Sequence, residues 1–195
     1  MWPSSVRLEG HFAALELLSE KHEKDLKEAV EDGLLYNLWY TAIPKADGIR
    51  LEIKRRLTMM KSKTMLPFAV IDQSQNRAVG MTTYMNIDAT NKRVEIGSTW
   101  YRKASQRTPI NTDCKMLLLT HAFEKLNCIA VEFRTHIMNE KSRKSIERLG
   151  AKLDGILRSH IIISNGTIRD TVIYSIIKAE WPTVKANLKH KLTRH

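Results

Sequence analysis

A helical pattern of apolar side chains stands out over residues 111–126. Apolar residues recur there every three or four positions, which places them on one face of a helix. They are Met116, Leu119, Phe123 and Leu126. A second helix is predicted over residues 20–31, where Ser19 is a favourable N-cap. Its apolar stripe consists of Leu26, Val30 and Leu34.

Three further stretches carry helical signals. Residues 48–60 follow Asp47, a residue type that caps helices well, and we expect their basic side chains to form a solvated face. Those side chains are Arg50, Lys54, Arg55 and Arg56. Residues 139–149 end at Gly150, which favours a left-handed C-cap. Residues 180–192 are basic and predict a terminal helix or a frayed end.

Strand signals occupy the stretches between these helices. Residues 66–71 and 78–87 are apolar runs joined by a polar turn, so they predict a hairpin. A second hairpin is predicted from residues 153–163 and 168–177, because an Asn-Gly pair lies between them. The remaining strand-like runs are 6–18 (interrupted at Gly10), 93–101 and 128–133.

The order of these elements predicts an α/β (α+β) fold in one domain, residues 1–195. Strand 93–101, helix 111–126 and strand 128–133 follow one another, so the two strands must be joined by a parallel crossover. The other neighbours can pair antiparallel through short turns. We therefore expect a mixed, mostly antiparallel central sheet with helices on both faces.

Composition narrows the class of protein. The 195 residues are 43% apolar and 27% charged, which is typical of a globular chain long enough to bury a core. Apolar runs such as 116–119 are far shorter than a membrane span, and residues 1–5 do not resemble a signal peptide. Cys114 and Cys128 make no disulfide framework, and we expect two reduced thiols in a cytoplasmic protein. The His and Cys spacings match no metal site.

Charge is unevenly distributed along the chain. The net charge is +11, but residues 1–44 carry −4 and residues 45–195 therefore carry +15. Such an excess favours an anionic partner: nucleic acid, a phosphorylated cofactor or an acidic protein. A solvated basic surface without a specific partner is the alternative, and charge alone does not separate the two.

Three stretches carry a resemblance to a known family. The first is Val94-Glu95-Ile96-Gly97, the second is the loop leading into helix 111–126, and the third runs from Asn139-Glu140-Lys141-Ser142 to Glu147-Arg148-Leu149-Gly150-Ala151. Together they resemble the GNAT superfamily of acetyl-CoA-dependent N-acetyltransferases. The first and third are similar to the Glu-Ile-Gly strand and the Asn-x-x-Ser helix of the RimJ/RimL-type group, which acetylates ribosomal-protein N-termini. The resemblance covers residues 6–177, with 178–195 as a basic C-terminal extension.

The loop 106–112 matches the family's phosphate-binding pattern only in part. A pyrophosphate needs several converging N–H groups, best at a helix N-terminus. The family pattern is Gln/Arg-x-x-Gly-x-Gly/Ala; Gln106 fits its first position, whereas Pro109 and Asn111 replace small residues, and Pro109 has no N–H. Arg107, Thr108, Asn111 and Thr112 offer side-chain donors instead. The alternative is an ordinary capped helix start; the other two stretches favour phosphate binding.

The resemblance also implies where the cofactor lies. In the family, the strand containing Glu95 and the strand 128–133 splay apart, and the pantetheine arm of CoA enters the gap. Backbone near Trp100 would hold the pantetheine, and Asn139 would cap the pocket from the other side. The implied cofactor-binding residues are Trp100, Gln106, Arg107, Thr108, Asn111, Thr112, Asn139, Ser142 and Arg143. No metal is implied.

The chemistry would be attack of a neutral amine on the thioester carbonyl, which requires a base and help for the departing thiolate. Glu95 matches the position of an acidic residue that acts as base in many family members; a strand-edge carboxylate paired with Lys or Arg is the alternative. Many relatives place a Tyr seven residues after the helix Asn, where this chain has Ile146. In the RimJ/RimL-type group the Ser of Asn-x-x-Ser lies near the sulfur, which implies Ser142; a capping hydroxyl is the alternative.

The predicted function is therefore acetyl transfer from acetyl-CoA to a primary amine, either a protein N-terminus or a small amino-acid-like molecule. Two alternatives are a module that kept the fold without the chemistry, consistent with Pro109 and Ile146, and a nucleic-acid binder, consistent with the basic charge. We expect no membrane partner. We also expect a homodimer through the hairpin 153–177, with Ile161, Ile163 and Ile173 as contact candidates.

Overall fold

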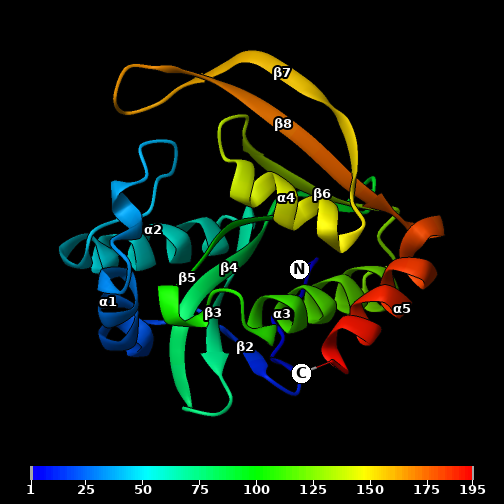
Figure 1. Ribbon diagram of the computed structural model, residues 1–195, viewed down its shortest axis with the longest axis horizontal. Coiled ribbons are helices and arrows are strands. Elements are labelled where there is room, and N and C mark those ends of the chain that lie inside the picture. The colour runs from blue at the N-terminus through cyan, green and yellow to red at the C-terminus, as the bar shows by residue number, and fades with distance from the viewer. Residues whose placement is uncertain (1, 195) are drawn as a thin grey trace.

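An eight-stranded sheet runs through the molecule in the order β1-β2-β3-β4-β5-β6-β8-β7 (Figure 1). The computed structural model describes residues 2–194. Neighbouring strands pair antiparallel except β5 and β6, which are parallel and joined by the predicted crossover helix. The expected mixed sheet is thus confirmed.

The strands are β1 (Leu8–Glu9), β2 (Ala13–Leu17), β3 (Met65–Asp72), β4 (Arg77–Asp88), β5 (Arg93–Tyr101), β6 (Ala130–His136), β7 (Lys152–Ile162) and β8 (Ile168–Ile177). The helices are α1 (Glu23–Glu31), α2 (Ile49–Lys61), α3 (Pro109–Thr120), α4 (Glu140–Leu149) and α5 (Trp181–Leu192). A π-helical segment, His121–Lys125, extends α3, and its last residue precedes the predicted helix end by one position. These bounds agree closely with those expected from the apolar patterns.

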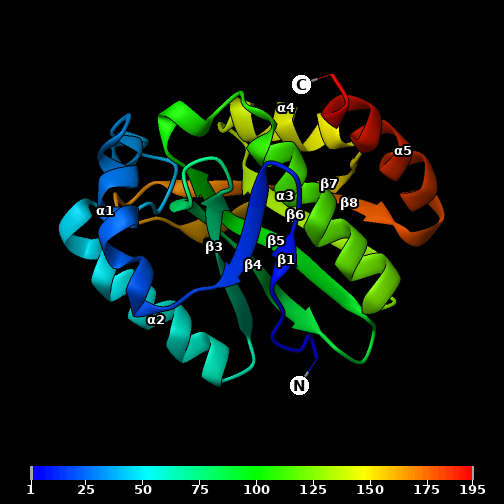
Figure 2. The ribbon, with the colours of Figure 1, turned by 90° about the horizontal axis from the view of Figure 1, so that it is seen from below.

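The helices cover the two faces of the sheet separately (Figure 2). Helices α1 and α2 share one apolar core with the sheet, to which Leu26, Ile53 and Trp100 contribute. Helices α3, α4 and α5 enclose a larger core on the opposite face, where Leu118, Ile146 and Trp181 are buried. Helices on both faces were expected, and this arrangement confirms them.

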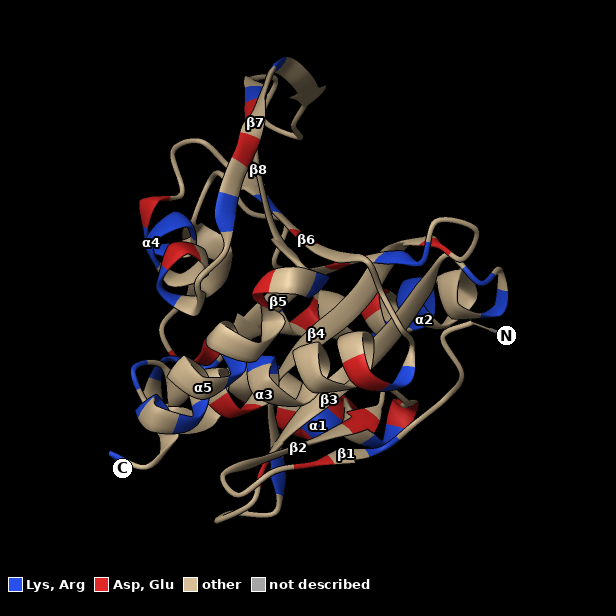
Figure 3. Cartoon of the chain, turned by 90° about the vertical axis from the view of Figure 1, so that its right-hand side faces the viewer, with Lys and Arg blue, Asp and Glu red and all other residues tan. Residues whose placement is uncertain are grey.

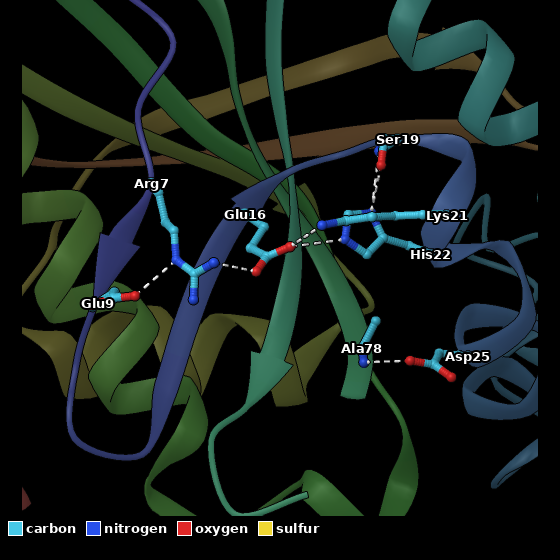
Figure 4. A network of polar contacts seen from close by, with 8 residues as sticks. All are labelled: Arg7, Glu9, Glu16, Ser19, Lys21, His22, Asp25 and Ala78. Atoms are coloured by element: carbon cyan, nitrogen blue, oxygen red, sulfur yellow. Dashed lines mark hydrogen bonds and ion pairs between the residues drawn. The ribbon is translucent and has the colours of Figure 1, made fainter. Parts of the chain in front are cut away.

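Polar contacts fasten α1 and the turn before it to the sheet (Figure 4). The Asp25 carboxylate accepts a hydrogen bond of 2.9 Å from the backbone N–H of Ala78 at the start of β4. Glu16 of β2 contacts Arg7, Lys21 and His22 at 2.6, 2.7 and 3.3 Å. The hydrogen bond from Lys21 is the largest of the influences that hold the pKa of Glu16 below its ordinary value. Helix α1 is therefore attached directly to β4, and the turn before it is attached to β2.

The terminal basic stretch forms helix α5, which packs along α3. Trp181 stacks on Phe123 with ring centroids 5.3 Å apart, and its Nε1 donates to Glu124 at 2.8 Å. The helical alternative for this segment is therefore the one observed. None of the helices within residues 2–194 is long and apolar enough to cross a membrane.

Three details of the predicted helices were wrong. Leu34 is 45% exposed, because α1 ends at Glu31 and Leu34 has a left-handed backbone with φ 49°. Asp47 does not cap α2, whose N-cap is Gly48. Arg56 is not solvated but only 3% exposed, because it follows Ile49 and Ile53 at helical spacing on the face turned to the sheet.

Candidate functional site

Strands β5 and β6 pair over three residues and then separate. Their paired rungs are Arg93–Ala130, Val94–Val131 and Glu95–Glu132. Beyond the last rung, residues 96–101 of β5 and 133–136 of β6 do not pair with one another. The divergence expected from the sequence is therefore present, and it leaves one edge of each strand turned toward a gap between them.

A β-bulge in β5 follows the last paired rung after Ile96 and Gly97. Thr82 of β4 faces two residues of β5, because the register shifts between the pairs Met81–Trp100 and Thr83–Gly97. The bulged residue Ser98 has a left-handed backbone, φ 47°. Its carbonyl accepts a hydrogen bond of 3.1 Å from the guanidinium of the buried Arg56.

Arg56 is thus a structural support of this bulge. Its guanidinium also donates to Glu52 at 2.6 Å and to Thr83 at 2.8 Å. These partners make burial of the cation tolerable, since a buried charge needs paired and hydrogen-bonded surroundings. The residue was expected on a solvated face, and its spacing from Ile49 and Ile53 was the sequence signal for burial.

Glu95 occupies the last paired rung and is only 4% exposed. Its Oε2 accepts a hydrogen bond of 2.6 Å from the Asn86 amide and lies 3.4 Å from Arg134 Nε. Burial raises the pKa of the Glu95 carboxyl despite the opposing effects of these two partners. The carboxylate is therefore paired with an arginine, as one reading of the sequence expected, and it lies where the two strands part.

An aromatic wall lines the same face of the sheet as Glu95. His136, the last residue of β6, packs its ring 5.3 Å from that of Trp39 and 6.2 Å from that of Tyr40. Its Nδ1 accepts a hydrogen bond from the Met138 N–H at 3.1 Å, while Nε2 is buried with no partner among residues 2–194. Burial lowers the pKa of His136. In the sequence, the only signal for this residue is its place at the end of an apolar strand.

The loop expected to hold phosphate ends in a capped helix start. Thr108 is the N-cap of α3: its hydroxyl donates to the Ser105 carbonyl at 2.8 Å and accepts from the Ile110 N–H at 3.4 Å. Gln106 donates from its side chain to the Tyr101 carbonyl at 3.1 Å. Arg107 is exposed with φ 63°, whereas Thr112 is buried in the first turn. Pro109 occupies the first helical position, where its missing N–H costs the helix nothing.

The start of α4 adjoins this loop. Asn139 caps α4, and its Oδ1 accepts a hydrogen bond of 3.1 Å from the N–H of the half-buried Ser142. Asn111 in α3 lies 3.4 Å from Ser145 in α4, amide nitrogen to hydroxyl. The structure therefore brings together the two stretches expected to bind one cofactor. Their helix N-termini both favour an anion.

Basic side chains surround the start of α4. Lys141, Arg143 and Lys144 all lie within its first turn and a half, together with Glu140, which lies 3.5 Å from Lys144. Figure 3 shows both charge types on α4. Arg143 is held in place, since its guanidinium donates to the Tyr174 hydroxyl at 3.2 Å and to the Ile137 carbonyl at 3.3 Å. This positive surface suits a phosphorylated ligand.

Trp100 contributes to the gap through its backbone alone. Its side chain is 4% exposed and belongs to the core shared with α1 and α2, on the face away from α3. The indole Nε1 is buried without a hydrogen-bond partner in the described part of the chain. The expectation that backbone at this position holds a ligand is unaffected by this orientation.

Sequence reasoning missed Lys115 altogether. This α3 residue is 7% exposed, and its Nζ lies 3.2 Å from Thr99 Oγ1 in β5. Burial lowers the pKa of Lys115 to about 8. A helical wheel would have revealed it, because Lys115 shares a face with Leu118 and Leu119.

Cys114 and Cys128 are free and buried. Among residues 2–194, no group of three or more His, Cys, Asp or Glu side chains is arranged to hold a metal ion.

Comparison with known proteins gives consistent matches. The model of the family described as "Acetyltransferase (GNAT) domain" matches residues 15–152. The curated Bacillus subtilis (strain 168) protein "Putative ribosomal N-acetyltransferase YdaF" is 37% identical over 102 residues, which cover 52% of this chain. The matched stretch covers 55% of the Bacillus protein, so it spans about half of that relative.

Solved structures match over nearly the whole chain. A GCN5-related N-acetyltransferase from Brucella melitensis superposes with a TM-score of 0.86 at 29% identity, covering 96% of this chain and 86% of that one. A "putative acetyltransferase from T. thermophilus" superposes with a TM-score of 0.85 at 30% identity, covering 98% of this chain and 100% of that one.

Proposed function

Because the chain belongs to the GNAT acetyltransferase family, we propose that it transfers the acetyl group of acetyl-CoA to a primary amine. The observation that carries this proposal is the gap between β5 and β6. Glu95 lies where the strands part, and Asn111 in the first turn of α3 contacts Ser145 in the second turn of α4. A proton acceptor and an anion-binding end are the two features that such a reaction requires.

The cofactor would be held by backbone and side chains that the fold leaves free. The first turn of α3 has N–H groups without intrahelical partners, and Arg107 and Thr108 flank them. Asn139, Ser142 and Arg143 would close the site from α4, and the unpaired edge of β5 near Trp100 would face the pantetheine. When bound, acetyl-CoA supplies an activated thioester carbonyl, and the protein supplies position and proton transfer.

The acceptor amine would approach from the Glu95 face. Its nitrogen must lose a proton before attack, because a primary amine is mostly cationic at neutral pH. Glu95 takes that proton directly or through a water, which its raised pKa favours. The N–C bond then forms, the nitrogen gives up its second proton to solvent, the C–S bond breaks, and the electron pair leaves with the sulfur. Ser142 would donate a hydrogen bond to that sulfur.

The acceptor class follows from charge and from similarity. The printed name of the Bacillus relative points to a ribosomal protein. A net charge of +11 favours an acidic protein or a small molecule over a basic one. We therefore put the N-terminus of an acidic protein first and a small amine second.

We also propose a cytoplasmic homodimer. Buried free thiols at Cys114 and Cys128 fit a reducing compartment. The β7–β8 hairpin exposes apolar side chains, among them Ile161 at 42%, whereas Ile163 and Ile173 are half-buried. A monomer in light scattering at micromolar concentration would contradict the pairing.

Thiol release from acetyl-CoA tests the activity. Peptides with acidic or basic N-terminal sequences and a set of small amines serve as acceptors, and mass spectrometry identifies the acetylated product. We expect turnover with one acceptor class, abolished or strongly reduced in Glu95→Gln and unchanged in the exposed control Glu28→Gln. Binding of acetyl-CoA without transfer to any acceptor would favour the inactive module.

A further inference from the structure

The α3 residue Lys115 carries a buried ammonium without a counter-ion. Its hydrogen bond to Thr99 Oγ1, at 3.2 Å, is the only one that it makes within residues 2–194. No carboxylate of those residues lies within 4.0 Å of its Nζ. An ammonium has three donors, so two remain unused.

This placement is unfavourable for the free protein. An unpaired charge loses its hydration on burial and gains little in return, whereas an apolar side chain would pack without that penalty. The apolar neighbours Leu118 and Leu119 occupy the same helical face. A ligand that accepts from the two unused donors would complete the site.

The ammonium lies between the two separated strands. Thr99 belongs to β5, and the Phe133 ring, whose centroid is 6.0 Å from Nζ, belongs to β6. Both residues follow the last paired rung. Thr99 is itself fixed by Thr82 at 2.8 Å. Lys115 therefore faces the gap from the α3 side, while Glu95 flanks it from the opposite face of the sheet.

We propose that Lys115 is the acid of the transfer reaction, hydrogen-bonded to the thioester and giving its proton to the CoA sulfur. This inference rests on the proposed function. The acceptor nitrogen forms its bond to the carbonyl carbon and the C–S bond breaks. The electron pair goes to sulfur, which takes the proton of Lys115 and leaves as the free thiol. Glu95 receives the proton lost by the amine, and solvent reprotonates Lys115.

The other titratable groups on the α3 side of the sheet are neutral around pH 8 or engaged elsewhere. His121 directly after α3 contacts the Tyr84 hydroxyl, and burial lowers the pKa of its imidazole. Cys114 beside Lys115 in α3 stays a neutral thiol, because burial raises its pKa to about 12. On β4 and β5, burial raises the pKa values of Tyr84 and Tyr101 well above their ordinary range. The Asp113 carboxylate is occupied elsewhere, accepting from the N–H groups of Phe12 and Ala13. On β6, Lys115 faces the uncharged Phe133.

The test compares wild type with Lys115→Met, which keeps the length of the side chain without its charge. We expect kcat to fall by roughly 10²–10⁴-fold while the Kd for acetyl-CoA changes by less than about tenfold. The wild-type kcat/KM for acetyl-CoA, which reports the groups of the free enzyme, should decline above about pH 8 as the ammonium loses its proton, and Lys115→Met should lack this decline. The control Lys125→Met, at an exposed lysine of the adjoining π-helical segment, should match wild type.

Three results overturn the proposal. The first is a Lys115→Met enzyme that has wild-type kcat and keeps the decline of kcat/KM above about pH 8. The second is a Lys115→Met protein that melts below wild type, since the ammonium would then serve the free fold. The third is an acetyl group found on Lys115 itself, which would make it a nucleophile. A wild type that binds no acetyl-CoA refutes the proposed function instead, and the two failures are thereby distinguished.

Discussion

One carboxylate oxygen of Glu95 occupies the space above Gly97: a Cβ atom at residue 97 would lie 2.8 Å from Glu95 Oε1. The two residues are neighbours on one face of β5, because side chains two apart along a strand point the same way. The same Cβ would lie 2.7 Å from the sulfur of Met85. Glycine in the Glu-Ile-Gly stretch therefore leaves room for the carboxylate to reach its buried position.

Gly97→Ala should displace Glu95 without unfolding the chain. Both obstructing atoms belong to the ends of flexible side chains, so the strand is retained while the carboxylate shifts. A misplacement of about 1 Å can reduce catalysis by about 10²-fold, and we expect a loss of that order in kcat. Gly155→Ala is the matched control, because a Cβ there meets nothing within 4 Å. Equal activity of both variants would show that the space above residue 97 does not matter.

Glu95→Gln should reduce kcat strongly at neutral pH, by roughly 10²–10⁴-fold. The amide keeps the shape of the side chain but accepts no proton. The defect should shrink as pH rises, because free amine accumulates without help from the enzyme. Initial rates across the pH range measure this. A variant with near-wild-type activity would mean that positioning alone carries the reaction and that solvent takes the proton.

Ser142→Ala should cost less than Glu95→Gln, and its defect should vary little with pH. The hydroxyl only donates a hydrogen bond to the sulfur and transfers no proton to it. Part of the loss should appear as a higher KM for acetyl-CoA, since the contact exists in both the ground and the transition state. Rescue of Ser142→Ala by alkaline pH, without rescue of Glu95→Gln, would reverse the two assignments.

Lys115 should make the stability of the free protein depend on pH. Its pKa is about 8 in the folded state against 10.5 for an unperturbed lysine. Below pH 8 Lys115 is charged in both the folded and the unfolded state, so the folded protein bears the whole free-energy cost of burying the ammonium. Between the two pKa values the unfolded state holds more protons, so the free energy of unfolding rises with pH. The difference between the two pKa values of Lys115 corresponds to a change of about 3 kcal/mol in the free energy of unfolding.

Chemical denaturation of wild type and Lys115→Met measures that dependence. The variant should be the more stable protein at pH 7, by up to about 3 kcal/mol, and its advantage should narrow as pH approaches 10.5. A constant difference across this range would show that the buried ammonium does not titrate there.

Element positions were predictable because local pattern determined them. Strand β5 has the expected bounds, and α4 begins after its Asn139 cap and ends at Gly150 with φ 106°. The parallel crossover followed from the order of elements alone. In each case the sequence signal and the tertiary packing agree.

The misplaced residues share a physical cause. Arg56 and Lys115 are long basic side chains on helical faces that turn toward the sheet. Arg56 was expected in solvent and Lys115 was overlooked, although the spacing of both places them inside. Only Arg56 finds carboxylate and carbonyl partners there. The surroundings of His136 could not be predicted for a similar reason: it packs against Trp39 and Tyr40, which are distant in sequence. Contacts of this kind are not encoded in local periodicity.

Calorimetric titration of the wild-type chain with acetyl-CoA tests the central claim most directly. The account predicts saturable binding of one molecule per chain, strongly weakened in the double variant Asn111→Ala and Asn139→Ala, whose melting temperature verifies that it folds. These two side chains lie at the adjoining starts of α3 and α4. Absence of binding by the wild type, or equal binding by the double variant, would contradict the placement of the cofactor in the gap between β5 and β6.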